Sequence, residues 1–150
     1  MARFAETSFL FACFVDQVRS RLTEPWLESV TEPTLVSRFV RYEFEQGVRF
    51  EAFLRRTKGH RGIPIERVPQ ILAAWEVELD RGTFQEVPCD WLQVANLASD
   101  ISDRHTIARG CRAFDLLHIA TALHLGAREF LSFDALQREV AEAEGLRVPL

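Results

Sequence analysis

The segment CRAFDLLHIATALHLG, residues 111–126, places one carboxylate in a helix that has almost no polar side. Asp115 stands there among leucine, isoleucine and alanine residues. A buried carboxylate loses its hydration, so it needs a partner that stabilises its charge, or it becomes protonated. The partner is either an arginine, with Arg112 three residues away, or a cation that several acids share.

A second acid interrupts an apolar helix face. At helical spacing, Glu43 falls in a row with Val36, Phe39, Val40, Gly47, Phe50 and Leu54. That row is the predicted buried stripe of its helix, whereas the neighbouring Glu45 has an ordinary solvent-facing position. A buried ion pair with Arg49 and a metal-ligand role are both open for Glu43.

Two further acids follow short apolar segments directly. Glu6 comes after RFA and Asp134 after EFLSF. Functional sites of parallel sheets form beyond the carboxyl ends of the strands, although either acid can also cap the helix that follows it. Four carboxylates in one pocket repel one another, and Mg²⁺ or Mn²⁺ removes that conflict by taking oxygen ligands. One or two such ions can activate water and stabilise a phosphate under in-line attack.

Alternating strands and helices must position these acids. We expect short strands within 3–5, 31–37, 83–89, 129–133 and 146–150. We expect helices over 9–22, broken near Pro25, and over 38–57, 65–82, 90–105, 111–126 and 134–145. This order predicts an α/β fold with a central, mainly parallel sheet of about five short strands flanked by helices.

The composition indicates one globular domain over residues 1–150. The chain is 47% hydrophobic and 27% charged, and no apolar run approaches the roughly 20 residues that cross a bilayer. Glu6 interrupts the apolar N-terminal stretch, which argues against a signal peptide. Cys13, Cys89 and Cys111 are scattered and odd in number, as expected of reduced thiols in a cytoplasmic protein.

The net charge of −4 hides an uneven distribution. Residues 38–67 carry eight basic and four acidic side chains, whereas residues 72–103 carry seven acids and Arg81 alone. Such a pattern is typical of a local basic surface, or of two solvated helix faces of opposite sign, and charge alone does not choose between them.

Taken in order, the acid motifs resemble those of the PIN-domain family, specifically the VapC-type toxin ribonucleases of type II toxin–antitoxin systems. FAETSFL resembles the first motif, with Glu6 in the position of an aspartate. EFEQGVR resembles a motif built on Glu43, with Gln46 and Gly47 in place of asparagine and alanine. DLLHIATA matches the third motif in full from Asp115. SFD, ending at Asp134, resembles the fourth, and the downstream glutamine and GLRV also fit, so the resemblance spans residues 4–148.

The resemblance implies a PIN-like fold and a Mg²⁺- or Mn²⁺-dependent endoribonuclease. Its implied catalytic and metal-binding residues are Glu6, Glu43, Asp115 and Asp134. It also implies a structured RNA substrate such as tRNA or rRNA, neutralisation by a small antitoxin, and a homodimer. Glu6 is one methylene longer than aspartate, and a shift of about 1 Å can cost a site about 10²-fold in rate. We interpret Glu6 as tolerated variation, because Glu-Thr-Ser starts resemble those of a subgroup of these toxins.

Further residues are candidates around these acids. Side chains that can hold the acids or bind a phosphate oxygen, and can equally cap helices or close turns, are Thr7, Ser8, Gln46, Thr106 and Ser132. Candidates for contacts with RNA phosphates, each of which can also be a simple surface charge, are Arg38, Arg41, Lys58, Arg61, Arg109 and Arg112. We expect His118 to be a hydrogen-bonded core residue.

Three alternatives remain. The chain can be a catalytically impaired PIN-like scaffold that binds RNA or protein, with Glu6 as a sign of lost activity. It can be an α/β interaction module in which Glu43 and Asp115 pair with arginines. A phospho-acceptor receiver domain also gathers acids at strand ends, but it requires a lysine beside them. Lys58 is the only lysine in the sequence and lies far from any expected strand end.

Overall fold

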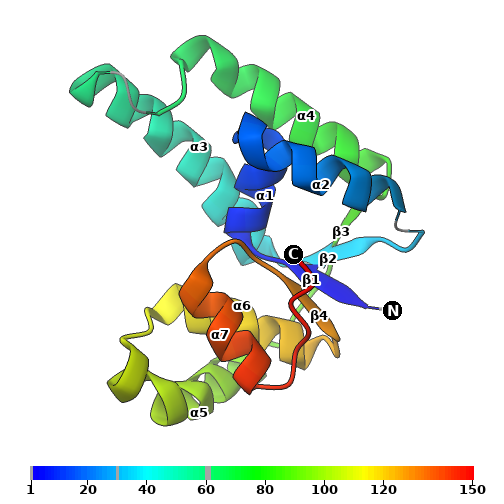
Figure 1. The fold of residues 1–150 in the computed structure, drawn as a ribbon, viewed down its shortest axis with the longest axis vertical. Helices are drawn as coiled ribbons and strands as arrows, with labels where there is room; N and C mark the ends of the chain where they lie inside the picture. Colours follow the sequence, from blue (N-terminus) through cyan, green and yellow to red (C-terminus); the bar gives the residue numbers. More distant parts are fainter. Residues whose placement is uncertain (1, 30, 60–61) are drawn as a thin grey trace.

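The computed structural model describes residues 2–29, 31–59 and 62–150, in which four parallel strands form one sheet (Figure 1). The strand order is β3-β2-β1-β4. The strands are β1 (Arg3–Ala5), β2 (Thr34–Val36), β3 (Phe84–Glu86) and β4 (Glu129–Leu131). This arrangement confirms the predicted α/β class and the parallel sheet.

The predicted fifth strand at 146–150 is reduced to a single bridge. Arg147 pairs in parallel with Glu129 on the outer edge of β4, and the pairing does not continue. Pro149 follows two residues later, and proline has no N–H group to donate to a strand ladder.

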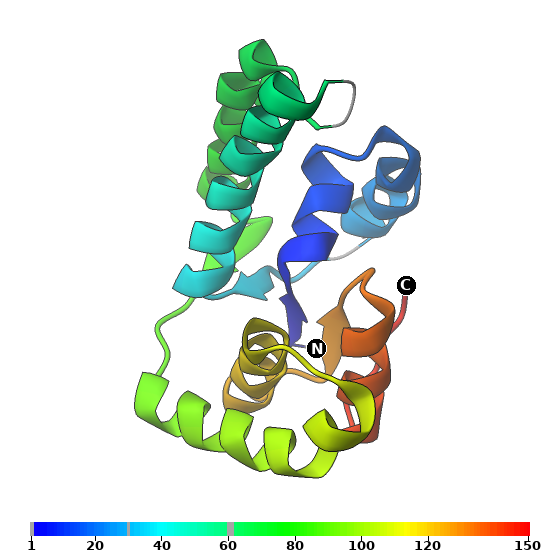
Figure 2. The ribbon, with the colours of Figure 1, turned by 90° about the vertical axis from the view of Figure 1, so that its left-hand side faces the viewer.

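Helices cover both faces of the sheet, as the two ribbon views show (Figures 1 and 2). On one side lie α1 (Thr7–Phe14), α2 (Gln17–Ser29), α3 (Arg38–Lys58) and α4 (Val68–Asp80), the last preceded by the short 3-10 helix η1 (Ile65–Arg67). On the other side lie α5 (Trp91–Arg109), α6 (Ala113–His124) and α7 (Ala135–Ala143). The α3 and α4 helices run side by side away from the sheet.

Aromatic packing fixes α3 and α4 against the sheet. The Trp75 ring of α4 is fully buried and lies 5.7 Å from Phe44 of α3 and 5.3 Å from Phe84 of β3, measured between ring centroids. Aromatic side chains bury large apolar areas, so this contact sets where the first turns of α3 stand. It therefore fixes the position of Glu43 relative to the strand ends.

Two details of the helices differ from the sequence prediction. The first predicted helix is broken at Val15 and Asp16, and Pro25 lies inside α2 instead of ending a helix. The Asp16 carboxylate accepts hydrogen bonds from the amides of Val18 and Arg19, at 3.0 and 3.3 Å, and so caps the start of α2.

The buried face of α3 also differs from the predicted stripe. Its buried residues are Val40, Phe44, Val48 and Ala52, whereas Phe39 and Phe50 are 37% and 51% exposed. Glu43 therefore lies at the border of the buried face, where its carboxylate can reach both the interior and solvent.

The three cysteines are free thiols, as predicted. No helix within the described ranges is long and apolar enough to cross a membrane.

Candidate functional site

The site forms at the point in the sheet where the order of strand addition reverses. From β1 the chain proceeds through β2 to β3 on one side, then crosses to β4 on the other side of β1. Such a switch point leaves a crevice beyond the carboxyl ends of β1 and its neighbour β4, and α/β proteins bind ligands in crevices of this kind. The Glu6 amide donates to the Leu131 carbonyl at 3.2 Å, so the two strand ends lie directly beside each other.

A pocket opens at this point and contains all four predicted acids; we call it the acid pocket. Its lining residues come from five helices and from the segments that follow β1 and β4 and precede α6: Glu6, Thr7, Ser8, Phe11, Arg19, Glu43, Gly47, Glu51, Arg112, Asp115, Asp134 and Gln137.

Glu6 is the most deeply buried acid, with 1% of its surface exposed. It is also the N-cap of α1, because its carboxylate accepts from the amides of Ser8 at 2.9 Å and Phe9 at 3.2 Å, and from the Ser8 hydroxyl. Burial raises the pKa of Glu6 above its ordinary value, and the hydrogen bonds from Ser8 oppose that rise. Glu6 thus combines the capping role and the pocket position that the sequence left as alternatives.

Glu43 is oriented by two side chains from other helices. The His118 Nε2 atom of α6 lies 2.7 Å from Glu43 Oε2, and the Thr7 hydroxyl of α1 donates to the same oxygen. Burial acts to raise the pKa of Glu43, but His118, Thr7 and the charge of Arg112 together lower it below its ordinary value. Arg49, the alternative partner considered for Glu43, pairs with Glu45 at 3.8 Å instead.

Asp115 and Asp134 share an arginine. Arg112 Nε donates to Asp115 Oδ2 at 2.9 Å, and Arg112 Nη2 lies 3.8 Å from Asp134 Oδ2. The hydrogen bond and charge of Asp115 raise the pKa of Arg112. The Arg112 side chain is 75% exposed whereas that of Asp115 is 11% exposed, so the arginine lies on the solvent side of the pocket.

Gln137 joins two of the acids, and sequence reasoning did not identify it as a site residue. Its Nε2 atom donates to Glu6 Oε2 at 3.3 Å and to Asp115 Oδ1 at 3.2 Å, and the residue is 5% exposed. Its Oε1 atom is buried and has no hydrogen-bond partner among the described residues. Gln137 lies three residues after Asp134, whose carboxylate accepts from the Gln137 amide at 2.9 Å as the N-cap of α7.

Three of the predicted supporting residues lie in or beside the acid pocket. Thr7 and Ser8 hold Glu43 and Glu6, as described. The Ser132 hydroxyl accepts from the Asp134 amide at 3.0 Å and lies 3.4 Å from that of Ser8.

The other two supporting candidates lie elsewhere. Gln46 is exposed on α3 and does not line the acid pocket. Thr106 lies in α5, where its hydroxyl contacts that of Ser102 at 3.0 Å.

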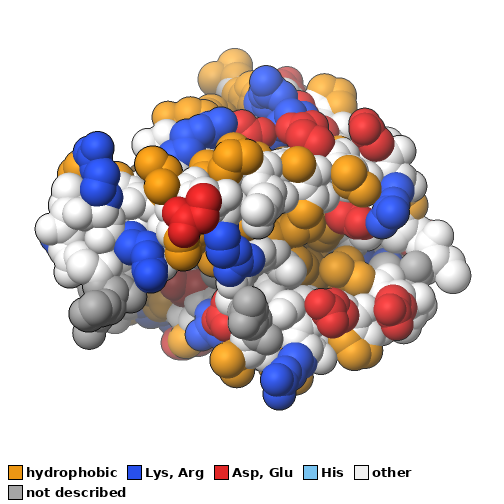
Figure 3. Space-filling view, turned by 90° about the horizontal axis from the view of Figure 1, so that it is seen from above, with side chains coloured by type: hydrophobic (Ala, Val, Ile, Leu, Met, Phe, Trp, Pro, Cys, Tyr) orange, Lys and Arg blue, Asp and Glu red, His pale blue; other side chains and the backbone are white. Residues whose placement is uncertain are grey.

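Most of the predicted phosphate contacts are already paired with acids. Arg38 and Arg41 both reach Glu86, and Arg41 also contacts Glu76 at 2.6 Å, so the acidic segment neutralises part of the basic one. Basic, acidic and hydrophobic side chains intermingle on the face seen in Figure 3.

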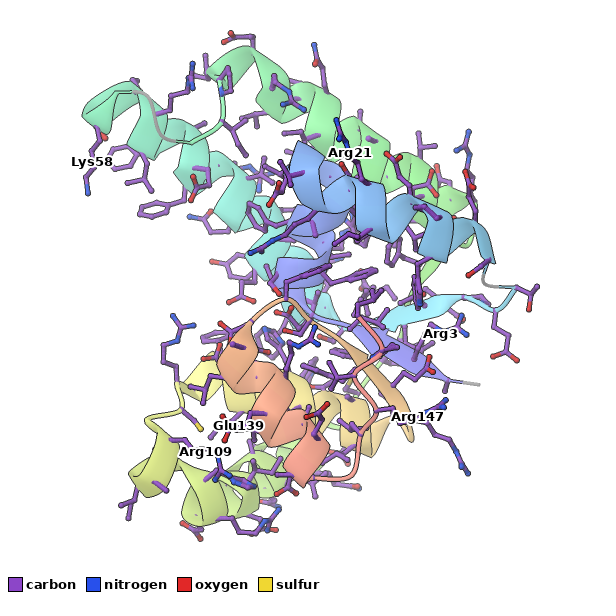
Figure 4. All side chains as sticks on the ribbon, in the orientation of Figure 1. Arg3, Arg21, Lys58, Arg109, Glu139 and Arg147 are labelled. Carbon is purple, nitrogen blue, oxygen red and sulfur yellow. The ribbon has the colours of Figure 1, made fainter. Side chains whose placement is uncertain are left out.

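The remaining phosphate candidates are dispersed. Arg109 pairs with Glu139 of α7 at 3.0 Å, and Lys58 stands at the far end of α3 (Figure 4). Arg61 lies outside the described residues. Of the six candidates, Arg112 lines the acid pocket; Arg19, which the sequence did not single out, lines it too.

The acids share the pocket but do not form a ready-made metal cage. In residues 2–29, 31–59 and 62–150, no three His, Cys, Asp or Glu side chains are arranged to hold an ion. Three of the carboxylate oxygens instead accept hydrogen bonds from side chains: Arg112 donates to Asp115, and Gln137 donates to Asp115 and Glu6. The donor set nevertheless fits a hard divalent cation, because four carboxylates supply the oxygen ligands that such ions prefer.

Comparison with known proteins identifies the family. The PIN domain model matches residues 3–143, and the chain therefore belongs to the PIN domain family, a family of nucleases that generally use divalent metal ions. No curated protein sequence matches the chain.

Two solved structures share the fold. VapC20 of Mycobacterium tuberculosis, a toxin that cleaves the sarcin-ricin loop, has a TM-score of 0.61 at 21% identity, with 97% of each chain covered. PAE2754 of Pyrobaculum aerophilum has a TM-score of 0.55 at 13% identity, covering 99% of this chain and 89% of that one.

Proposed function

We propose that the chain is a metal-dependent endoribonuclease, with residues 1–150 acting as one PIN domain. The observation that carries the proposal is the convergence of Glu6, Glu43, Asp115 and Asp134 on one pocket at the switch point of the sheet. These acids come from four separate parts of the chain, and four like charges at one place repel one another, a repulsion that a bound cation relieves. The fold shared with VapC20, an RNA-cleaving toxin, supports RNA as the substrate class.

The four acids would hold Mg²⁺ or Mn²⁺. When bound, such an ion lowers the pKa of water and stabilises the charge of the attacked phosphate. The residues of this chain provide orientation: Thr7 and His118 fix the direction of Glu43, and Ser8 fixes that of Glu6. Arg112 and Arg19 at the rim of the pocket supply positive charge for the neighbouring phosphates of an RNA strand.

We further propose that the chain acts as a VapC-type toxin in the cytoplasm, as a homodimer that a small antitoxin neutralises. Support comes from the order of the four acid motifs and from the fold shared with VapC20 over 97% of both chains. Expression without the antitoxin should then arrest growth, whereas expression of the Asp115→Asn variant should not.

The direct test is incubation of purified protein with cellular RNA in the presence of Mn²⁺. We expect the wild type to cut RNA and Asp115→Asn to lose more than about 10²-fold in rate. Asp103→Asn, which removes an exposed acid of α5, is the matched control and should cleave like the wild type. Equal cleavage by all three proteins would exclude the acid pocket as the source of activity.

One observation favours a second candidate function. Arg112 pairs with Asp115, as expected of an interaction module whose buried acids pair with arginines, and such a pair also suits a PIN-like scaffold that only binds RNA or protein. That alternative predicts no cleavage of RNA with Mn²⁺ and no toxicity on expression.

A further inference from the structure

Three aromatic rings gather beside the acid pocket, each from the start of a different helix. Phe39 of α3 lies 4.4 Å from Trp91 of α5 and 6.3 Å from Phe114 of α6, between ring centroids. We call these three residues the aromatic cluster. Phe114 directly precedes Asp115 in the chain, and Phe39 stands one helical turn before Glu43. The cluster therefore borders two of the four acids.

The cluster is open to solvent. Phe114 is 47% exposed and Phe39 37% exposed, and Tyr42, one turn after Phe39 on the same helix, is 61% exposed. A single exposed apolar side chain is ordinary, but several together beside a functional pocket mark an interaction surface.

The geometry of Phe114 leaves room for a flat partner. Its ring neighbours among the described residues are Phe39 and His118, each with a centroid 6.3 Å away. Their planes are inclined to that of Phe114 by 84° and 56°, so neither ring is stacked in parallel on it. An aromatic face that is exposed and unstacked is suited to bind a nucleobase, because every base has a π-face of its own.

A positive charge stands next to this surface. Arg112, two residues before Phe114, has a side chain that is 75% exposed. A nucleic-acid strand offers a phosphate to the arginine and a base to the ring within one nucleotide, whereas an apolar peptide offers no anion. This combination of an exposed ring, a cation and the bordering acids therefore favours RNA as the occupant.

We propose that Phe114, supported by Phe39, stacks an unpaired nucleobase of the RNA strand whose phosphate lies in the acid pocket. The inference rests on the proposed function for its substrate class and adds a requirement to it. A base can stack on Phe114 only if it is free of its own helix, so the platform selects unpaired segments of RNA.

The test is binding of a fluorescein-labelled oligouridylate, followed by anisotropy in EDTA so that no cleavage occurs. An abasic ribose–phosphate chain of the same length is the second probe. Phe114→Leu should weaken oligouridylate binding about five- to tenfold and leave binding of the abasic chain unchanged. Phe53→Leu is the control, because Phe53 is also 47% exposed but lies near the far end of α3, and it should change neither affinity.

If Phe114→Leu does not fold, Phe114→Trp tests the stacking proposal in its place. Phe114→Trp should bind oligouridylate at least as tightly as the wild type does, and should bind the abasic chain with wild-type affinity. Weaker oligouridylate binding by a folded Phe114→Trp protein would overturn the proposal. An equal loss on both probes, or no loss with folded Phe114→Leu, would also overturn it. Sedimentation is the remaining check, in case Phe114→Leu dissociates a dimer while oligouridylate binding is not selectively weakened. That result would assign the cluster to an interface between two copies and would also overturn the proposal.

The failure of the platform and the failure of the nuclease are distinguishable. Base-dependent binding in EDTA without cleavage in Mn²⁺ would uphold the platform and remove the nuclease. Cleavage in Mn²⁺ without base-dependent binding would support the nuclease and overturn base stacking on Phe114.

Discussion

His118 of α6 and Glu43 of α3, 75 residues apart in the chain, are joined by a hydrogen bond of 2.7 Å between Nε2 and Oε2. The His118 side chain is 2% exposed, whereas the Glu43 side chain is 38% exposed. The histidine thus anchors, from the interior, a carboxylate whose other side faces the acid pocket. Because α3 lies on one face of the sheet and α6 on the other, this hydrogen bond fixes the acids of the two helices relative to each other.

His118→Ala should therefore destabilise the fold. The substitution removes a hydrogen bond to a charged group and leaves a cavity, which together cost about 3 kcal/mol of unfolding free energy. Urea denaturation without added metal measures the loss. His124→Ala is the control: His124 accepts one long bond, 3.3 Å from the Asp90 amide, and should cost less than about 1 kcal/mol. Similar losses for the two variants would show that the Glu43 contact contributes nothing particular.

Gln137→Met should reveal how much the shared amide stabilises the metal-free site. Methionine has a similar size but cannot donate, so the carboxylates of Glu6 and Asp115 would lose a buried donor, at a cost of about 1–3 kcal/mol. Urea denaturation in EDTA measures this effect. Added Mn²⁺ should restore part of the lost stability, because the cation takes over the neutralising role; a variant as stable as the wild type in EDTA would contradict the structural role of the amide.

The sequence identifies the acids but not this amide, and the difference is physical. Asp115 and Glu43 stand out because a carboxylate on an apolar helix face is costly and must have a reason. Glu6 and Asp134 stand out because each directly follows a predicted strand. A glutamine in the first turn of an amphipathic helix has no such cost, so Gln137 carries no signal of a site role beyond its fit to the family pattern. Its role depends on α7 placing it between two acids that are far away in the sequence.

The choice of which face of α3 is buried shows a second limit of prediction from the sequence. The helix has two apolar rows, and the row through Phe39, Glu43 and Phe50 was predicted to be buried. The structure buries Val40, Phe44, Val48 and Ala52, a row that shares only Val40 with the predicted one, because Trp75 and the sheet pack on that side. Periodicity alone cannot select between two apolar rows, since the choice depends on which neighbours pack against the helix.

Glu6→Asp tests whether the longer side chain is needed. Aspartate is an equally good N-cap and offers the same carboxylate, so RNA cleavage with Mn²⁺ should be retained. Glu6→Ala should abolish cleavage and also cost about 1–2 kcal/mol of stability, because the start of α1 loses its cap. Gel assays of cleavage and urea denaturation separate the two effects. Full activity of a folded Glu6→Ala protein would remove Glu6 from the site.

Glu144, which lies outside the acid pocket, should make the stability of the fold depend on pH. Its carboxylate binds Arg104 Nη2 and His105 Nε2, each at 2.7 Å, and the hydrogen bond from Arg104 helps to lower the pKa of Glu144 below its ordinary value of 4.5. A lowered pKa in the folded state stabilises the protein above the unfolded pKa, and the stabilisation is lost as pH falls through the folded pKa.

Glu144→Gln should therefore cost about 1 kcal/mol at neutral pH and progressively less toward about pH 3, as measured by urea denaturation across that range. Glu139→Gln is the control, because the Glu139 side chain is 62% exposed and an exposed pair contributes little. A cost for Glu144→Gln that stays constant with pH would contradict the assignment.

The central claim is that the acid pocket binds a divalent cation, and thermal unfolding with and without Mn²⁺ tests it most directly. Wild type and Asp115→Asn are compared in parallel, with Asp103→Asn as the exposed-acid control. A ligand that binds only the folded state must raise the unfolding midpoint. We predict a rise for the wild type and for Asp103→Asn, and none for Asp115→Asn. An unchanged wild-type midpoint at saturating Mn²⁺, or the same rise in Asp115→Asn, would contradict the account.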